Sequence, residues 1–263
     1  PSVFVVDDGL TTDHEISVTG VDPCTTVFFE VRSTDALGNI GVDTNGGDYY
    51  SVETAGWGAF FTETFDSDPG WAIDNGNEPP ATGWGFGQPT GQGQDSYGGP
   101  DPTAGATGDN VYGVNLGGDI SPNLQENELK LTTPVIDLSA ATSAQLRFQR
   151  WLGVERDTYD NARIRLSTDG GITWSTVWEN GGDTIDDSAW SEMVVDLPTA
   201  VGSSQVRIQW TYGSTDGSWN YCGWNIDDVV VEGAMPCGGL PMIFTDGFET
   251  GDCTMWTEMV VSP

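Results

Sequence analysis

The chain has very little positive charge. Only 8 of its 263 residues are lysine or arginine, against 40 aspartates and glutamates, which gives a formal net charge of −32 at pH 7. Nucleic acids and anionic membrane surfaces would repel such a chain, so we expect neither as a partner. The carboxylates have two interpretations, a solvated acidic surface or oxygen-rich sites for hard cations such as calcium.

Residues for proton transfer and for zinc binding are also scarce. Lys130 is the only lysine and His14 the only histidine, and no Cys-X-X-Cys motif is present. A Ser-His-Asp triad would depend on His14, in a segment that we expect to be an exposed loop. A zinc knuckle is equally unexpected. Paired carboxylates can cleave glycosides, but nothing in the sequence places two of them across a cleft. We therefore expect a protein that is not an enzyme.

Long apolar runs and helical periodicity are missing as well. No run of 18 or more apolar residues occurs, so no membrane insertion is expected. No segment of useful length repeats its apolar residues with the 3.6 period of a helix. We recognise no signal peptide, and the chain opens at Pro1. We interpret it as a piece of a longer secreted or cell-surface polypeptide.

Four widely spaced cysteines favour disulfides formed in an oxidising compartment. They are Cys24, Cys222, Cys237 and Cys253, and three pairings are open. Cys222 and Cys237 bracket an extended strand that is too long for a direct bridge. We favour a bond between Cys237 and Cys253.

Short segments rich in β-branched and aromatic residues, separated by turn signals, are abundant. In Cys222–Gly233, CGWNIDDVVVEG, the three valines predict a buried strand. Alternation along a strand predicts that Asp227 and Asp228 face opposite ways, and the inward carboxylate needs an arginine or a bound cation. Similar segments from residue 110 onward predict an all-β protein with an antiparallel two-sheet sandwich, most specifically a jelly roll.

The N-terminal part has a resemblance of its own. ISVTGVDPCTTVFFEVRSTDALGN resembles the E and F strands of a fibronectin type III module, and the first half of such a module is missing. Residues 1–56 are therefore interpreted as a partial fibronectin type III-like segment. A short link is expected at Ala55–Gly58.

Residues 57–235 resemble the MAM-like jelly-roll domains appended to secreted bacterial metallopeptidases and surface proteins. The resemblance is carried, in order, by ETFDSDPGW, GWGFGQPTG, GDNVYGVNLGGD, LTTPVIDLS, STDGGITW and GWNIDDVVV. It implies an accessory module without its own catalysis, with calcium held near the first and last strands. The residues that it implies as calcium ligands are Glu63, Asp66, Asp68, Asp227 and Asp228. The regular cysteine pairs of true MAM domains are absent.

Residues 236–263 are expected to form a C-terminal strand or tail. FTDGFETGD in this tail echoes FTETFDSD near residue 61. The tail would either cap the domain or add to a neighbouring chain's sheet edge, which would make the protein a self-assembling surface subunit.

Aromatic residues in expected loops offer a second type of site. They are Trp84, Phe86, Tyr97, Trp219 and Tyr221. Their rings would either close the core or stack on the sugar rings of a polysaccharide or cell-surface glycan.

Two further motifs stand out. STDGGITW, Ser167–Trp174, fits an Asp-box hairpin in which Asp169 accepts hydrogen bonds from backbone N–H groups across the turn. Glu155, Asp157 and Asp160 form an acidic turn that is either solvated or able to hold a cation. The complete sequence predicts a non-catalytic, extracellular, calcium-stabilised accessory or adhesion module of a larger protein. A carbohydrate-binding module and a self-assembling subunit are the alternatives.

Overall fold

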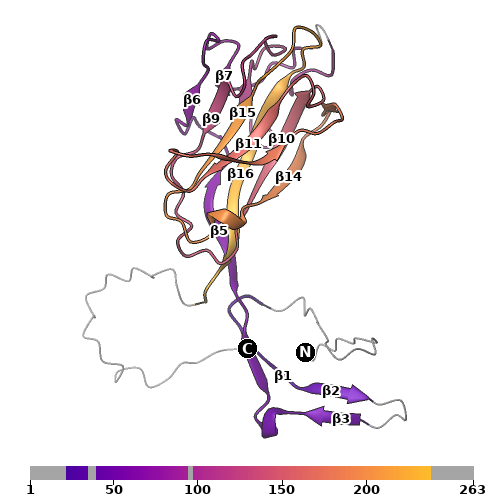
Figure 1. The fold of residues 1–263 in the computed structure, drawn as a ribbon, viewed down its shortest axis with the longest axis vertical. Coiled ribbons are helices and arrows are strands. Elements are labelled where there is room, and N and C mark those ends of the chain that lie inside the picture. The colour runs from indigo at the N-terminus through magenta and orange to yellow at the C-terminus, as the bar shows by residue number, and fades with distance from the viewer. Residues whose placement is uncertain (1–21, 35–39, 94–96, 238–263) are drawn as a thin grey trace, which may run out of the picture.

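The protein is an all-β antiparallel jelly-roll sandwich with two small β-hairpins beside it (Figure 1). The computed structural model describes residues 22–34, 40–93 and 97–237. His14, the first part of the fibronectin type III-like segment and the tail from residue 238 lie outside these ranges. Within the described ranges, no helix has the length and apolar character needed to cross a membrane.

Two antiparallel sheets form the sandwich. The larger has seven strands in the order β13-β10-β16-β8-β7, with β14 also beside β10 and β5 also beside β16. Its strands are β5 (Gly56–Glu63), β7 (Trp84–Gly87), β8 (Val111–Val114), β10 (Gln145–Val154), β13 (Ile185–Asp186), β14 (Ser191–Asp196) and β16 (Gly223–Met235). The smaller has five strands in the order β12-β11-β15-β9-β6. Its strands are β6 (Ala72–Asp74), β9 (Leu129–Thr132), β11 (Ala162–Ser167), β12 (Ser175–Glu179) and β15 (Arg207–Tyr212).

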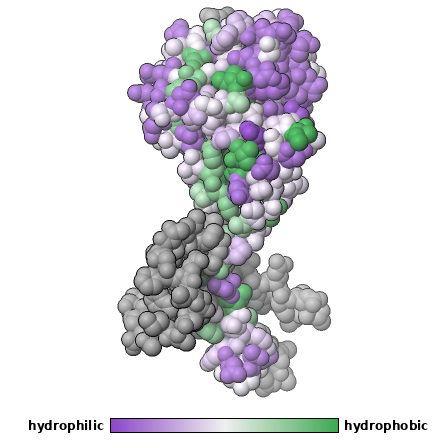
Figure 2. Space-filling model, turned by 90° about the vertical axis from the view of Figure 1, so that its left-hand side faces the viewer, coloured by the Kyte–Doolittle hydropathy of each residue, from purple (hydrophilic) through white to green (hydrophobic). Residues whose placement is uncertain are grey.

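The core lies between these sheets and is rich in aromatic rings. Alternate residues of β9 and β11 are buried, as expected for strands with one face on a core. Trp71 stacks on Tyr112 and on Trp210, with ring centroids 5.7 and 5.8 Å apart. Such large rings bury more apolar area than any other side chains, so they contribute strongly to the stability of the sandwich. The outer surface is mainly polar, with scattered apolar residues (Figure 2).

The central strand of the larger sheet is β16. One of its edges pairs with β10, and the other pairs first with β8 and then with β5. Val229 and Val231 are fully buried, as the run of valines predicted. Since β5 and β16 are antiparallel neighbours, the chain enters and leaves the sandwich at the same end.

Two hairpins precede the sandwich and project away from it (Figure 1). One pairs β1 (Thr26–Phe29) with β4 (Tyr50–Glu53), and the other pairs β2 (Val31–Thr34) with β3 (Ile40–Asp43). Short 3₁₀ turns occur at η1 (Asn45–Gly47) and η2 (Pro198–Ala200). Phe28 and Ile40 remain 66% and 67% exposed, because two-stranded sheets cannot build a core of their own. The fibronectin type III-like assignment and the three domain boundaries stay predictions.

The expected link at Ala55–Gly58 is wrong in part, because β5 already begins at Gly56. In this region Gly56 pairs with Met235 at the end of β16. Both glycines of the link, Gly56 and Gly58, therefore belong to the sheet.

The disulfide joins Cys24 to Cys237, with Cα atoms 5.1 Å apart. The predicted pairing of Cys237 with Cys253 is therefore wrong, and Cys253 lies outside the described residues. The backbone N–H of Cys24 donates to the Thr54 carbonyl just before β5, and Cys237 follows the end of β16. Pairing of β5 with β16 therefore brings the two cysteines together, although 213 residues separate them in sequence. Cys222 is buried and free.

Candidate functional site

The residues predicted as calcium ligands gather partly around the loop at residues 105–108. Oδ2 of Asp227 accepts a hydrogen bond from the Thr107 backbone N–H at 3.0 Å. Oδ1 of Asp228 accepts one from the Thr107 hydroxyl at 2.8 Å. A Cβ at Gly105 would lie 2.7 Å from Oδ2 of Asp227, so the close approach of this loop requires glycine.

The expectation that Asp227 and Asp228 face opposite ways is wrong. The pairing of β10 with β16 shifts register between Arg147 and Gln149, and Asp228 has a left-handed φ of 48°. This is a β-bulge, and it interrupts the strict alternation of side chains along β16. Both carboxylates therefore contact Thr107.

Asp227 is fully buried. An arginine or a bound cation was expected beside it, and none of the ion pairs among the described residues joins it to an arginine. Burial raises the pKa of Asp227 to about 6, against the lowering effect of hydrogen bonds from the Thr107, Asp228 and Ala106 backbone N–H groups. These backbone N–H groups thus stabilise the negative charge of Asp227 in part, as an arginine would.

The three other predicted ligands make local hydrogen bonds. Oε1 of Glu63, at the end of β5, accepts from the Phe65 N–H at 3.1 Å. Oδ2 of Asp66 accepts from the Thr64 hydroxyl at 2.9 Å, and Oδ1 of Asp66 faces Gly108. Oδ1 of Asp68 accepts from the Tyr112 hydroxyl at 2.8 Å and from the Gly70 N–H. The structure thus brings Asp66 to the loop that Asp227 and Asp228 contact, while Asp68 supports Tyr112. The calcium site stays a prediction.

Two of the predicted ligand-binding aromatics lie on a strand and not in loops. Trp84 and Phe86 belong to β7. Trp84 is 1% exposed, and Phe86 packs edge-on against Tyr112 with centroids 5.4 Å apart. Both side chains pack in or against the core, and both residues lie on β7. The prediction that they lie in loops is therefore wrong. Tyr221 does lie in a loop, but it is only 5% exposed.

Tyr97 and Trp219 form an exposed aromatic pair. Their rings stack with centroids 4.3 Å apart and an interplanar angle of 28°. Tyr97 is 46% exposed and Trp219 is 44% exposed, so each ring keeps a large accessible area. Trp219 lies in the loop between β15 and β16 and has a left-handed φ of 60°. The structure therefore brings together two aromatic residues that are 122 positions apart, from the two loops predicted to carry them.

Two further tryptophans hold the loop that follows Tyr97, a role that no sequence motif indicated. The Trp151 indole N–H donates to the Pro100 carbonyl at 3.1 Å, and the Trp190 indole N–H donates to the Ala104 carbonyl at 3.2 Å. The Gly99 N–H donates to Oδ1 of Asp186 at 2.8 Å. These bonds link the loop to the larger sheet. They therefore hold the backbone that follows Tyr97 in place.

A buried carboxyl group lies in the same loop. Asp101 is 1% exposed, and its Oδ1 accepts a hydrogen bond from Nδ2 of Asn225 at 2.8 Å. Its Oδ2 has no hydrogen-bond partner among the described residues. Burial raises the pKa of Asp101 to about 8, so this group holds a proton at neutral pH.

The Asp-box hairpin is confirmed. The Ile172 and Thr173 N–H groups donate to Oδ1 of Asp169 at 3.1 and 2.9 Å. Hydrogen bonds from the Thr173 hydroxyl, the Thr173 N–H and the Ser167 hydroxyl are the main causes that lower the pKa of Asp169 well below its usual range. Gly170 and Gly171 have positive φ, and the Trp174 indole N–H donates to the Gly171 carbonyl. The motif thus shapes a tight turn.

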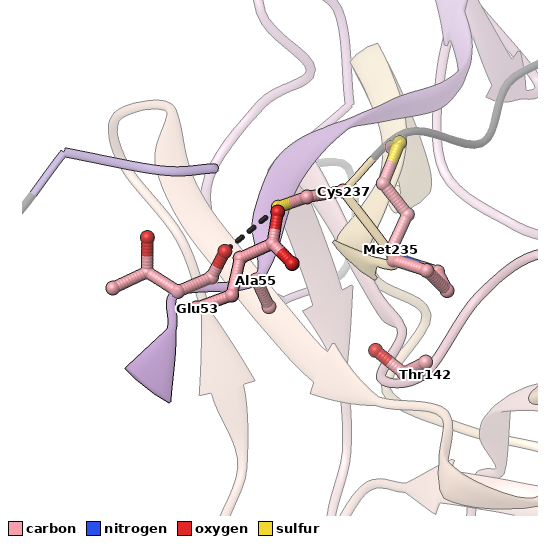
Figure 3. Close-up of a pocket in the computed structure, with 7 residues that line it drawn as sticks. Glu53, Ala55, Thr142, Met235 and Cys237 are labelled. Carbon is pink, nitrogen blue, oxygen red and sulfur yellow. Dashed lines mark hydrogen bonds between the residues drawn. The ribbon is translucent and has the colours of Figure 1, made fainter. Parts of the chain in front are cut away.

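A shallow depression of about 320 Å³ lies where the hairpins meet the sandwich (Figure 3). Residues on its wall include Glu53, Thr142 and Met235. Sγ of Cys237 lies 2.7 Å from the Thr54 carbonyl oxygen at its rim. Glu53 is the only ionisable side chain among the described residues that line it, so these residues supply no acid–base pair.

Comparison with known proteins finds sequences that are similar to the part of this chain that forms the sandwich. The family model "Reelin subrepeat B" matches residues 124–232. Bacillopeptidase F of Bacillus subtilis (strain 168) is 27% identical over 173 residues, which are 66% of this chain and 11% of that protein. The chain thus spans about a ninth of the length of this curated relative.

Among solved structures, the K1 cleaved adhesin domain of Lys-gingipain from Porphyromonas gingivalis W83 has 18% sequence identity and a TM-score of 0.44, covering 67% of this chain and 99% of that one. The CBM22-1 xylan-binding domain of Xyn10C from Paenibacillus barcinonensis has 9% identity and a TM-score of 0.35, covering 70% and 98%. In sequence, the chain is similar to the reelin subrepeat B family from the residues just before β9 to near the end of β16.

Proposed function

We propose that this chain is a non-catalytic accessory or adhesion module of MAM-like type within a longer secreted or cell-surface protein. The observation that carries the proposal is the position of the sandwich's two connections. The chain enters at β5 and leaves at β16 on the same end, where the Cys24–Cys237 disulfide joins them. Closely spaced connections suit a domain inserted into a longer chain, and the disulfide suits an oxidising compartment. Similarity to 11% of a much longer protein, Bacillopeptidase F, supports the same conclusion.

Calcium is proposed to stabilise this module at the junction of its first and last strands. Asp66 follows β5, and Asp227 and Asp228 lie on β16, with the Thr107 loop between them. Carboxylate and carbonyl oxygens from such loops are the ligands that calcium prefers. An ion here would link the end of β5 to β16, at the opposite end of their pairing from Gly56 and Met235.

Melting experiments in calcium and in EDTA test this calcium proposal. At a free calcium concentration about 100 times the dissociation constant, binding adds about 2.7 kcal/mol, which raises the melting temperature by roughly 5–10 °C. Asp227→Asn and Asp228→Asn should each reduce that rise. Asp196→Asn, an exposed aspartate on β14, is the matched control and should retain it. An unchanged rise in both of the first two variants would contradict the proposal.

Carbohydrate binding is the second candidate function, and the Tyr97–Trp219 pair is the observation that favours it. Flat exposed rings on a fixed frame present apolar faces on which sugar rings stack. The hydrogen bonds of Trp151 and Trp190 keep the Tyr97 loop in place, so little conformational entropy would be lost on binding.

A polysaccharide and glycan array, probed with the full chain in calcium and in EDTA, tests this candidate. Trp219→Ala should weaken binding about tenfold, a loss of about 1.4 kcal/mol. Trp57→Ala removes a comparably exposed tryptophan at the start of β5 and should leave binding unchanged. Bound polysaccharide should be recovered at its original length. If the folded chain binds nothing on the array, carbohydrate binding is excluded. Adhesion through a protein ligand would then be the remaining function.

A further inference from the structure

Three carboxylates from distant parts of the sequence meet at one end of the sandwich. Glu155 follows β10, Asp160 precedes β11, and Asp216 lies in the loop between β15 and β16. One oxygen atom of each lies within 4.8 Å of the other two. Asp157, which the sequence grouped with Glu155 and Asp160, is exposed and does not belong to this group.

The protein backbone around the three carboxylates is fixed without any ion. Nδ2 of Asn180, a residue that is 2% exposed, donates to the carbonyl oxygens of Glu155 and Asp160 at 2.9 and 3.0 Å. Its Oδ1 accepts from the Ala162 N–H at 2.9 Å. The Asp216 N–H donates to Oδ1 of Asp160 at 3.1 Å. These bonds hold the two ends of the turn and the distant loop in one arrangement.

The Glu155 carboxylate has no hydrogen bond or ion pair with any described residue, although Glu155 is only 5% exposed. Asp160 is 1% exposed, and its side chain is hydrogen-bonded to the Asp216 backbone. The nearest cation in sequence, Arg156, is exposed and lies over the Tyr159 ring, 6.0 Å from its centroid. An unpartnered buried carboxylate is costly, because protein surroundings replace the water that would stabilise its charge.

The electrostatics of the group agree with this geometry. Burial raises the pKa of Asp160 to about 7, and the charges of Glu155 and Asp216 add to the effect. Burial and the charge of Asp216 also raise the pKa of Glu155, while Arg156 opposes the change. The nearby like charges thus disfavour the ionised forms of Glu155 and Asp160, and a bound cation would favour them.

We propose that Glu155, Asp160 and Asp216 form a calcium-binding site made of different residues from those at the β5–β16 junction. Calcium binds oxygen ligands at about 2.3–2.6 Å, so oxygens on opposite sides of the ion lie about 5 Å apart, in keeping with this group. Magnesium requires distances of about 2.0–2.1 Å and near-ideal octahedral geometry, which three carboxylates from separate loops satisfy less well. Solvent on the open side of the group completes the coordination.

Calorimetric titration of the full chain with calcium tests the site. Glu155→Gln keeps the shape of the side chain and removes its charge, so the site should lose at least tenfold in calcium affinity. Asp157→Asn, two positions along the same turn, is the matched control and should bind as the unmodified chain does. Each titration is repeated in an Asp228→Asn background, so that binding at the β5–β16 junction is not mistaken for binding here.

Melting in EDTA separates loss of the site from loss of the fold. Glu155→Gln removes one of three mutually repelling charges, so without calcium it should melt at the same temperature as the unmodified chain or higher. In calcium it should show a smaller rise than the unmodified chain. Unchanged calcium affinity in folded Glu155→Gln would overturn the proposal, as would equal losses in Asp157→Asn. Magnesium binding as tight as calcium binding would overturn the assignment of the ion.

Discussion

Asp101 shows how a single buried carboxyl group sets a pH dependence. Its pKa of about 8 lies far above the ordinary value of 3.8 because burial penalises its charge. The folded state therefore holds a proton that the unfolded state has already released between about pH 4 and pH 8. Since the folded state binds more protons in this window, the free energy of unfolding falls as pH rises.

Asp101→Asn should remove that contribution to the pH dependence. The slope lost is at most about 1.4 kcal/mol per pH unit, the value for one proton. Urea unfolding at several pH values between 5 and 8 measures the slope for each protein. Glu155, Asp160 and Asp227, whose pKa values are also raised, contribute with the same sign, so the difference between the two slopes is the relevant quantity. Equal slopes would show that Asp101 is ionised throughout this range.

At the level of single residues, the sequence predicted local contacts and missed distant ones. The hydrogen bonds of Asp169 were predictable because they all fall within one turn. The shared contact of Asp227 and Asp228 was not, because a bulge depends on pairing with β10. Asp216 lies 56 positions beyond Asp160, and only the folded loops bring the two together.

Close packing of β16 against a neighbouring loop depends on Gly233. A Cβ at this position would lie 1.9 Å from the Ser143 carbonyl oxygen, which is a backbone atom. The Thr142 N–H donates to the Ala234 carbonyl at 2.7 Å in the same region, so the two segments are held together. The backbone has little freedom to move away.

Gly233→Ala should therefore lower the free energy of unfolding by about 3 kcal/mol, in the upper range for overpacking. The matched control is Gly181→Ala, where no atom lies within 4 Å of the added Cβ. The control should change stability by less than about 0.5 kcal/mol. Denaturant unfolding of both variants gives the comparison. A loss below 1 kcal/mol for Gly233→Ala, on the order of ordinary surface changes, would show that this contact relaxes easily.

Most longer strands were predictable because β-branched and aromatic residues cluster in them. β10, β11, β15 and β16 all lie in the region from residue 110 onward where strands were predicted. β7 was missed because its sequence, Trp-Gly-Phe-Gly, alternates rings with glycine, which has low strand propensity. β13 was missed because two residues carry no periodic signal. Strand order within each sheet depends on contacts between distant segments, and the sequence did not specify it.

At the scale of the whole molecule, the Cys24–Cys237 disulfide joins the chain before β5 to the chain after β16. Cross-linking residues that are 213 positions apart restricts the unfolded chain, and chain-entropy arguments give a stabilisation of about 5 kcal/mol for such long loops. The predicted pairing of Cys237 with Cys253 failed because the sequence does not show which segments lie beside the end of β16. The neighbour of Cys237 is set by the pairing of β5 with β16.

Peptide mapping without reduction should find Cys24 linked to Cys237. The Cys222 thiol is 1% exposed, so it should react with alkylating reagents only after denaturation. Cys24→Ser should lower the free energy of unfolding by about 5 kcal/mol. Recovery of a Cys237–Cys253 peptide as the main product would contradict the structure.

The same bond determines how the molecule responds to mechanical tension. When the chain is pulled from positions before Cys24 and after Cys237, the load passes through the disulfide and bypasses the 212 residues between them. The hydrogen bonds of β5 with β16 then carry none of that force. Such tension would leave the loops at the far end of the sandwich in place, and reduction of the disulfide would transfer the load to the sheet.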